Sequence, residues 1–182
     1  SRLIEFKNAI DNTFKTNLLA QNSKAGASSV YENAKEYSPA KAIDGDEDTY
    51  WTTEKGEKTG TLEIEFDEVK EFDVVSIEEY IEKGQRISEF EVEYQTADGQ
   101  WLPFEDGHTI GAKKLLRIDP IQAKAIRINI TRSYAEPMIS EVGIYKTADG
   151  FEKTQPLPEA YTKFVYGDDE RLELNKGTWD GD

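Results

Sequence analysis

The chain has 182 residues, 37% of them hydrophobic, a length that suits one domain of ordinary size with terminal extensions. Its 37 acidic residues outnumber its 22 basic residues, and the formal net charge of -15 argues against nucleic acid and anionic membranes as partners. The sequence contains no cysteine, which excludes disulfides, zinc–thiolate sites and thiol catalysis.

The first element expected along the chain is an amphipathic helix over residues 3–14. Apolar residues recur there every three or four positions, at Leu3, Phe6, Ile10 and Phe14. The chain begins abruptly with this pattern and shows no signal peptide, which suggests a fragment of a longer protein. No later run is long and apolar enough to span a membrane.

An acidic turn follows at residues 42–51, which read AIDGDEDTYW. It places several carboxylates and a threonine around Gly45, and such dense oxygen ligands suit a hard cation such as calcium. The spacing is not that of an EF-hand, because no glutamate closes a twelve-residue loop. A solvated acidic turn that binds nothing is the alternative, and the motif alone does not separate the two.

The middle of the chain predicts β-strands. Apolar and polar residues alternate over residues 61–66, 90–94 and 125–130, and residues 74–77 form a more buried run. Asp98 and Gly99 predict a two-residue hairpin turn between two such segments. Strands that follow one another without intervening helices indicate antiparallel sheets, and hence a β-sandwich or jelly roll.

The last part of the chain, residues 147–182, is interpreted as a linker or tail. Its prolines and the acidic run at residues 168–170 favour irregular structure, whereas its apolar and aromatic residues favour partial order. The lone histidine, His108, comes with no serine or cysteine nucleophile motif and is expected to be structural or exposed.

Several segments resemble a known family. The acidic turn is similar to the A-[IV]-D-G-x-x-x-T-x-W turn of galactose-binding-like domains, which include discoidin or coagulation-factor C-type domains and family 32 carbohydrate-binding modules. The opening RLIEFKNAIDNTFKTNLL resembles the last catalytic-domain helix of bacterial glycoside hydrolase family 29 α-L-fucosidases. Residues 74–95, 108–118 and 136–146 resemble later strands of the domain appended to those enzymes, so the resemblance covers about residues 2–146.

The resemblance implies an all-β, galactose-binding-like jelly-roll sandwich preceded by one α-helix. It divides the chain into a terminal helix of a missing catalytic domain (1–16), a discoidin-like sandwich (17–146) and the tail (147–182). It also implies a structural calcium, held by side-chain or backbone oxygens of Lys41, Asp44, Asp46, Thr49 and Glu141. No catalytic residue is expected here, because the family's catalytic carboxyls belong to a barrel that would precede Ser1.

A sugar site needs an aromatic ring to stack on C–H groups and planar polar groups for the hydroxyls. The candidates in or near predicted loops are Tyr31, Tyr37, Tyr80, Arg86 and Tyr134. Arg86 stands out because GQRIS resembles the NGRIS loop of sugar-binding relatives. Tyr37 and Ser38 stand where galactose-binding relatives often have a histidine, whereas Trp51 and Trp101 are interpreted as core residues.

The function implied is a non-catalytic, carbohydrate-binding ancillary domain of a bacterial α-L-fucosidase, with fucosylated or galactose-containing glycans as ligands. The alternative is a structural brace that packs on the parent's own catalytic domain and binds no sugar. The resemblance also implies an extracellular or periplasmic location. An independent enzyme is not expected.

Overall fold

A computed structural model describes residues 2–19 and 22–148. Most of the predicted tail, from residue 149 onward, therefore lies outside the described residues. Helix α1 (Arg2–Thr13) matches the predicted amphipathic helix, and its side chains are exposed over residues 2–8. No helix among the described residues is long and apolar enough to cross a membrane.

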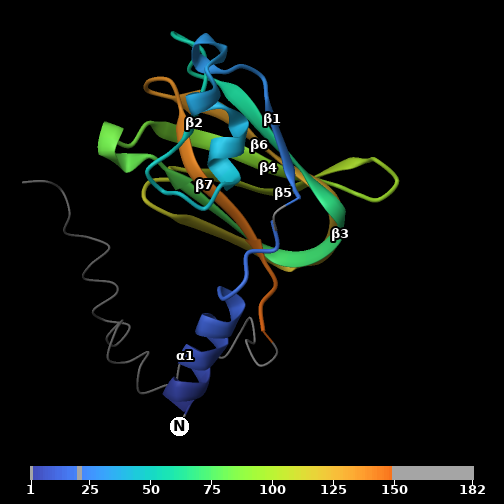
Figure 1. Ribbon diagram of the computed structural model, residues 1–182. Helices are drawn as coiled ribbons and strands as arrows, with labels where there is room; N and C mark the ends of the chain where they lie inside the picture. The colour runs from blue at the N-terminus through green and yellow to red at the C-terminus, as the bar shows by residue number, and fades with distance from the viewer. Residues whose placement is uncertain (1, 20–21, 149–182) are drawn as a thin grey trace, which may run out of the picture. The chain divides into compact units, whose positions relative to one another are not determined.

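The rest of the described chain consists mostly of β-strands, joined by turns and short 3-10 helices (Figure 1). The strands are β1 (Lys24–Ala27), β2 (Trp51–Thr52), β3 (Gly60–Glu79), β4 (Ile87–Gln95), β5 (Trp101–His108), β6 (Lys114–Ser133) and β7 (Met138–Tyr145). The 3-10 helices are η1 (Tyr31–Asn33), η2 (Lys35–Tyr37), η3 (Pro39–Ile43) and η4 (Ile81–Lys83). Every pairing between the described strands is antiparallel.

The two long strands, β3 and β6, each contribute to two layers. The first part of β3 pairs with β1 and with the last part of β6, which in turn pairs with β4. The second part of β3, from Val74, pairs with β7 and with the start of β6. Irregularities between Glu65 and Lys70 and between Phe72 and Val74 interrupt the register where β3 passes from one layer to the other.

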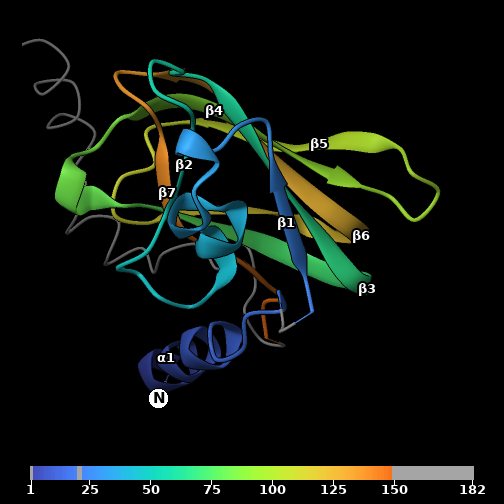
Figure 2. The same cartoon turned by 45° about the horizontal axis from the view of Figure 1, so that its top comes forward.

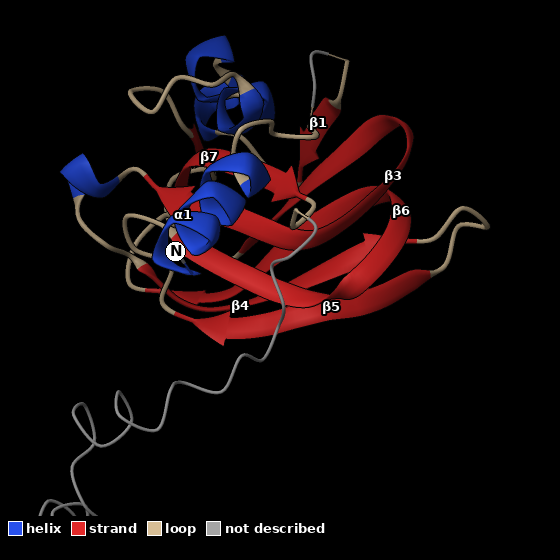
Figure 3. Ribbon diagram, turned by 90° about the horizontal axis from the view of Figure 1, so that it is seen from below, coloured by secondary structure: helices blue, strands red, loops and turns tan. Residues whose placement is uncertain are grey.

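The resulting strand order is β2-β7-β3-β6-β4-β5, with β1 added beside β3. Figures 2 and 3 show this sheet curling around on itself, and in Figure 2 α1 is drawn below the strands. The predicted all-β jelly-roll sandwich preceded by one helix is therefore confirmed.

The core lies between the two layers and follows the predicted alternation. Leu62 and Ile64 of β3 and Ile128 of β6 are fully buried, while their neighbours along each strand face outward. Residues of β7 line the core from the other layer, among them Ile139, Val142 and Ile144. Trp51 is also fully buried, as predicted, and its indole N–H donates to the Ser29 carbonyl at 3.0 Å.

The hairpin between β4 and β5 is longer than predicted. The Thr96 N–H donates to the Gln100 carbonyl at 2.9 Å, which leaves three residues in the loop instead of two. Gly99 has a φ of +94°, the left-handed conformation that such a three-residue loop requires near its end. The Thr96 side chain contacts Asp98 and caps the loop, an arrangement that the Asp-Gly pair alone does not reveal.

The end of α1 is fastened to the end of β7. The Thr13 hydroxyl, which is buried, accepts a hydrogen bond from the Ala148 N–H at 3.0 Å. Phe14 and Tyr145 make an edge-to-face contact with ring centroids 5.0 Å apart. Leu18 then pairs with Ile144 through a backbone hydrogen bond of 2.9 Å. The helix and the sandwich therefore belong to one compact unit that ends at Ala148.

Candidate functional site

The acidic turn is closed around the side chain of Asp44. Its carboxylate accepts hydrogen bonds from the Asp46 N–H at 3.0 Å and from the Thr49 hydroxyl at 2.9 Å. Lys41 approaches the same carboxylate at 3.2 Å. Gly45 has a φ of +78°, which a residue with a side chain adopts only at a cost.

Strand β7 brings Glu141 to this turn from 96 positions away in the sequence. The Glu141 carboxyl accepts a hydrogen bond from the Gly45 N–H at 3.0 Å. Glu141 and Asp44 both line an open hollow of about 400 Å³, together with Asn17 and Ser23. All five residues predicted to hold calcium therefore meet in one place.

The electrostatics around Glu141 and Asp44 favour a bound cation. Burial raises the pKa of the Glu141 carboxyl from 4.5 to about 8, and the charge of Asp44 adds to the shift while the hydrogen bond from Gly45 opposes it. A cation bound next to Glu141 and Asp44 would offset both the burial of Glu141 and the charge of Asp44.

The donors offered by the turn fit calcium better than a transition metal, since all of them are oxygens. Among the described residues, however, no three His, Cys, Asp or Glu side chains form a metal-binding group. Calcium takes six to eight oxygens, so backbone carbonyls would have to complete its shell. The calcium site stays a prediction.

Tyrosine rings gather beside the turn. Tyr31 and Tyr37 meet edge to face at 5.5 Å, Tyr37 and Tyr50 lie 5.4 Å apart, and Tyr50 stacks on Tyr80 at 4.4 Å. We call these four residues the tyrosine cluster. Three of them were predicted as sugar contacts. Tyr50 was not, although its place in a predicted loop, next to the core residue Trp51, was a usable signal.

Carboxylates surround the tyrosine cluster. The charge of Glu32 is the main cause that raises the pKa of Tyr31, and Glu136 raises it further. A hydrogen bond to Glu82 is the main cause that raises the pKa of Tyr80. Both shifts move the pKa of these two phenols further from physiological pH, and acidic side chains border the cluster.

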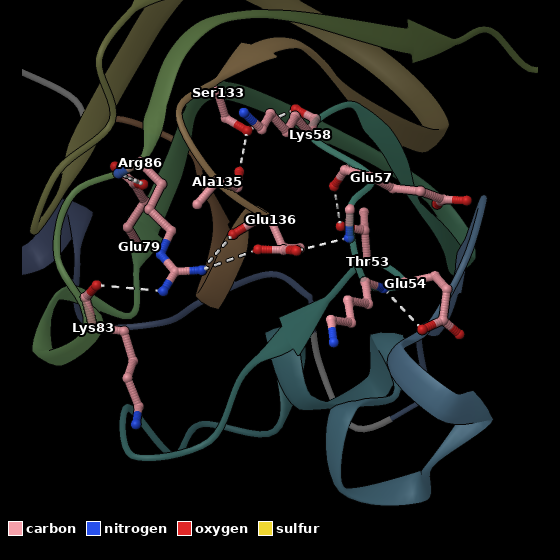
Figure 4. Close-up of polar contacts among 12 residues, drawn as sticks. Thr53, Glu54, Glu57, Lys58, Glu79, Lys83, Arg86, Ser133, Ala135 and Glu136 are labelled. Atoms are coloured by element: carbon pink, nitrogen blue, oxygen red, sulfur yellow. Dashed lines mark hydrogen bonds and ion pairs between the residues drawn. The ribbon is translucent and has the colours of Figure 1, made fainter.

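Arg86 lies in the same loop as Tyr80, between β3 and β4, and its guanidinium points toward Glu136 (Figure 4). Its guanidinium donates to the Glu136 carbonyl at 3.0 Å and lies 3.8 Å from the Glu136 carboxylate. A longer contact of 3.5 Å reaches the Lys83 carbonyl. The other oxygen of Glu136 accepts a hydrogen bond from the Gly56 N–H at 2.7 Å, which is the main cause that lowers the pKa of Glu136.

Glu136 is a polar residue of this site that the sequence analysis did not nominate. It links Arg86 to the Gly56 loop and acts on Tyr31 electrostatically, so it joins the predicted arginine to the tyrosine cluster. Tyr134 is different. Its backbone N–H donates to the Arg86 carbonyl at 2.9 Å, but its ring is 73% exposed and takes part in none of the ring pairs among the described residues.

Trp101 does not lie in the core, contrary to its interpretation from the sequence. It is half-buried on β5, and the Arg127 guanidinium lies over its ring, 4.2 Å from the centroid. Arg127 alternates with the buried Ile126 and Ile128, so the pair occupies the outer face of the sheet. His108 is exposed.

The sequence matches the F5/8 type C domain family over residues 24–142. Alpha-L-fucosidase 1 of Arabidopsis thaliana is 28% identical over 147 residues, which are 79% of this chain and 29% of that protein. A solved GH29 fucosidase of Ruminococcus gnavus, in complex with fucose, is 46% identical with a TM-score of 0.76, over 84% of this chain and 31% of that chain. The chain thus spans about a third of the length of the fucosidases that it matches.

A smaller solved protein shares the whole fold. The family 32 carbohydrate-binding module of NanJ from C. perfringens, solved with galactose, superposes with a TM-score of 0.63 at 20% identity, over 72% of this chain and 98% of that chain. At this identity the likeness supports the fold alone. The matched fucosidases are covered only over a part that contains this discoidin-like sandwich. The chain belongs to the F5/8 type C domain family.

Proposed function

We propose that the chain is a non-catalytic, carbohydrate-binding ancillary domain of an α-L-fucosidase. The observation that supports this most is the tyrosine cluster beside Arg86 and Glu136, at one end of the sandwich. Rings of this kind stack on the C–H face of a sugar, and a guanidinium paired with a carboxylate offers donors and acceptors to its hydroxyls. Reaction chemistry would belong to the larger parent enzyme.

The ligand we propose is a fucosylated or galactose-containing glycan. We expect affinity in the millimolar to high-micromolar range, because a shallow site on one sugar unit buries little area. Since such glycans are displayed outside cells, we place the domain outside the cytoplasm, in the medium or periplasm of a bacterium.

Titration of the 182-residue chain with fucose, galactose and 2′-fucosyllactose, followed by NMR, tests the proposal. Tyr80→Ala and Arg86→Ala should each weaken binding by roughly tenfold, because each removes a stacking ring or charged donor. Arg2→Ala is the matched control, since Arg2 is exposed at the start of α1. No shift with any of these sugars would overturn the proposal.

We further propose that the domain holds a structural calcium in the acidic turn. Asp44 and Glu141 would supply carboxylates, and the carbonyls of Lys41, Asp46 and Thr49 would complete the shell. The raised pKa of Glu141 beside Asp44 supports this, because a cation relieves the repulsion of two adjacent carboxyls. Bound calcium would tie the turn to β7 and keep the neighbouring Tyr50 in place.

A second candidate function is a brace for the catalytic domain. Leu3 is 78% exposed and Ile4 60% exposed on α1, whereas the end of the helix is fastened to β7 through Thr13 and Phe14. The exposed apolar face of α1 could pack on a neighbouring domain, and the contacts of α1 with β7 would then hold that domain against the sandwich. The two roles are compatible.

A further inference from the structure

The carboxyl of Glu79 is buried beneath the proposed sugar site. Glu79 is 3% exposed at the end of β3, one residue before Tyr80 of the tyrosine cluster. It takes part in none of the ion pairs among the described residues. A buried carboxyl without a counter-charge is costly unless hydrogen bonds compensate for its lost hydration.

Backbone N–H groups supply that compensation. One carboxyl oxygen of Glu79 accepts from the Arg86 N–H at 2.8 Å and from the Ile87 N–H at 2.9 Å. The other accepts from the Gly111 N–H at 2.7 Å. The Glu79 N–H completes the arrangement by donating to the Gly111 carbonyl at 3.0 Å. Bonds of this kind to a carboxylate are stronger than those between neutral groups.

The alternation of side chains along β3 directs Glu79 into this position. Ile77 is fully buried in the core, and Glu79, two residues further on, is on the same face of the strand. Along the β3–β7 pair, Glu78 faces Glu141, but Glu79 faces Ile139, so the irregularity leaves one residue of β7 unpaired at this point. The core face of β3 therefore ends in a carboxyl instead of an apolar side chain.

Two of the three N–H donors lie in loops, Arg86 between β3 and β4 and Gly111 between β5 and β6, and the third, Ile87, begins β4. The first loop carries both Tyr80, whose N–H donates to the Met138 carbonyl at 3.1 Å, and Arg86. Glu79 therefore joins the two ends of the Tyr80–Arg86 loop to each other. In Figure 4 Glu79 lies next to Arg86, whose guanidinium extends the other way, toward Glu136.

We infer that Glu79 is a positioning residue for the sugar site: it touches no sugar but fixes the Tyr80 ring and the Arg86 guanidinium at a set separation. This inference rests on the proposed function. Its physical basis is preorganisation, because a loop that is already ordered loses less conformational freedom when it binds a ligand.

Glu79→Gln in the 182-residue chain tests the inference. The carboxamide has nearly the same shape as the carboxyl but only one acceptor oxygen. Its NH₂ group would therefore face an N–H group from which the carboxyl accepts a hydrogen bond. We expect binding of galactose or fucose, measured by NMR titration, to weaken roughly tenfold. Amide hydrogen exchange at Arg86, Ile87 and Gly111 should become faster.

Asp73→Asn is the matched control. Asp73 is also a buried carboxyl, 2% exposed, on the same strand, and it accepts from the Thr147 N–H at 2.8 Å far from the tyrosine cluster. Both variants should melt at lower temperature, but only Glu79→Gln should lose sugar affinity. Equal affinity losses in the two variants, or wild-type affinity in Glu79→Gln, would overturn the inference.

The remaining outcomes also decide the question. If the wild-type chain binds none of the sugars, the proposed function fails, and the positioning role is then judged on exchange alone: unchanged protection of Arg86 and Ile87 in Glu79→Gln overturns it. If Glu79→Gln does not fold, Glu79→Asp replaces it, because it keeps the acceptors on a shorter side chain. Faster exchange confined to these loops supports the inference, and wild-type exchange overturns it.

Discussion

Glu141 carries its carboxyl into a half-buried position near Asp44, where the Gly45 N–H is its one hydrogen-bond donor among the described residues. Burial and a like charge both disfavour the ionised form, so the pair needs either a proton or a cation. A bound cation should raise the stability of the folded chain, whereas a bound proton should make its stability fall as pH rises. Both effects can be measured.

Calcium is expected to stabilise the folded chain. At about 100 times its Kd, a ligand that binds only the native state adds about 2.7 kcal/mol, which for a domain of this size raises Tm by roughly 5 °C. Glu141→Gln should remove most of this rise, measured by thermal melting in millimolar calcium and in chelator. Equal Tm values for the wild type in the two buffers would contradict a bound cation.

The control for Glu141→Gln is Glu105→Gln, on β5 and exposed. Glu79, although it lies on another segment, does not serve as a control, because its buried carboxyl accepts three backbone hydrogen bonds. Its loss would lower Tm for a reason unrelated to calcium.

The pKa of Glu141 predicts a pH dependence without metal. Between its ordinary value of 4.5 and about 8, the folded chain holds a proton on Glu141 that the unfolded chain has released. The folded state then binds more protons, so this group makes the free energy of unfolding fall as pH rises through that window. The difference in free energy of unfolding between the wild type and Glu141→Gln isolates the effect, measured by thermal melting in chelator at several pH values across this window. Calcium should abolish it, and a difference that does not change with pH would contradict the assignment.

At the scale of the elements, the β4–β5 hairpin depends on the conformation of one glycine. Gly99 has a φ of +94°, and a Cβ there would meet, within 4 Å among the described residues, only the Lys124 ammonium at 3.8 Å. Gly99→Ala should therefore cost about 1–2 kcal/mol through backbone strain and not through a clash. Gly26→Ala is the control, since its Cβ would meet nothing within 4 Å and its φ is not positive. Equal melting temperatures for the two variants would show that the loop relaxes without cost.

The strands could be predicted because their apolar residues alternate with polar ones, as Leu62 and Ile64 do around Glu63. That signal is local and so is read directly from the sequence. It could not show that residues 61–66 and 74–77 belong to one strand. The two segments are joined across irregularities in the pairing of β3 with β6, a strand that is distant in the sequence.

The site was predictable where its residues lie in recognisable loops, as Tyr80 and Arg86 do. Glu136 and Glu79 escaped notice because their roles arise from partners distant in the sequence: the Gly56 N–H is 80 positions from Glu136, and the Gly111 N–H is 32 positions from Glu79. The prediction that Trp101 lies in the core was wrong for a similar reason, because the side chain that covers its ring, Arg127, belongs to another strand.

At the scale of the whole molecule, the proposed sugar site and the end of α1 lie at opposite ends of β7. Met138 at its start accepts a hydrogen bond from Tyr80, and Tyr145 at its end contacts Phe14. Eight residues of strand separate these points, about 25 Å at roughly 3.3 Å per residue. The proposed sugar site and the contacts that hold α1 are thus well separated along β7.

This separation predicts the effect of deleting the chain from Asn17 onward in the full parent enzyme. Turnover of a small aryl fucoside should be unchanged, whereas retention on an immobilised fucosylated glycan should fall, because only the glycan-holding surface is lost. Activity assays and affinity chromatography on the two forms provide the measurement. A fall in aryl fucoside turnover, with a lower Tm of the remaining enzyme, would favour the brace instead.

The position of β7 also has a mechanical consequence. A glycan held near Tyr80 and a helix held near Tyr145 would pull on β7 along its own axis. Its hydrogen bonds to β3, from Val74 to Glu79, lie across that axis and would be loaded in shear, all at once and not one after another. An enzyme drawn by flow while its ancillary domain grips a surface would therefore strain a ladder that yields only as a whole.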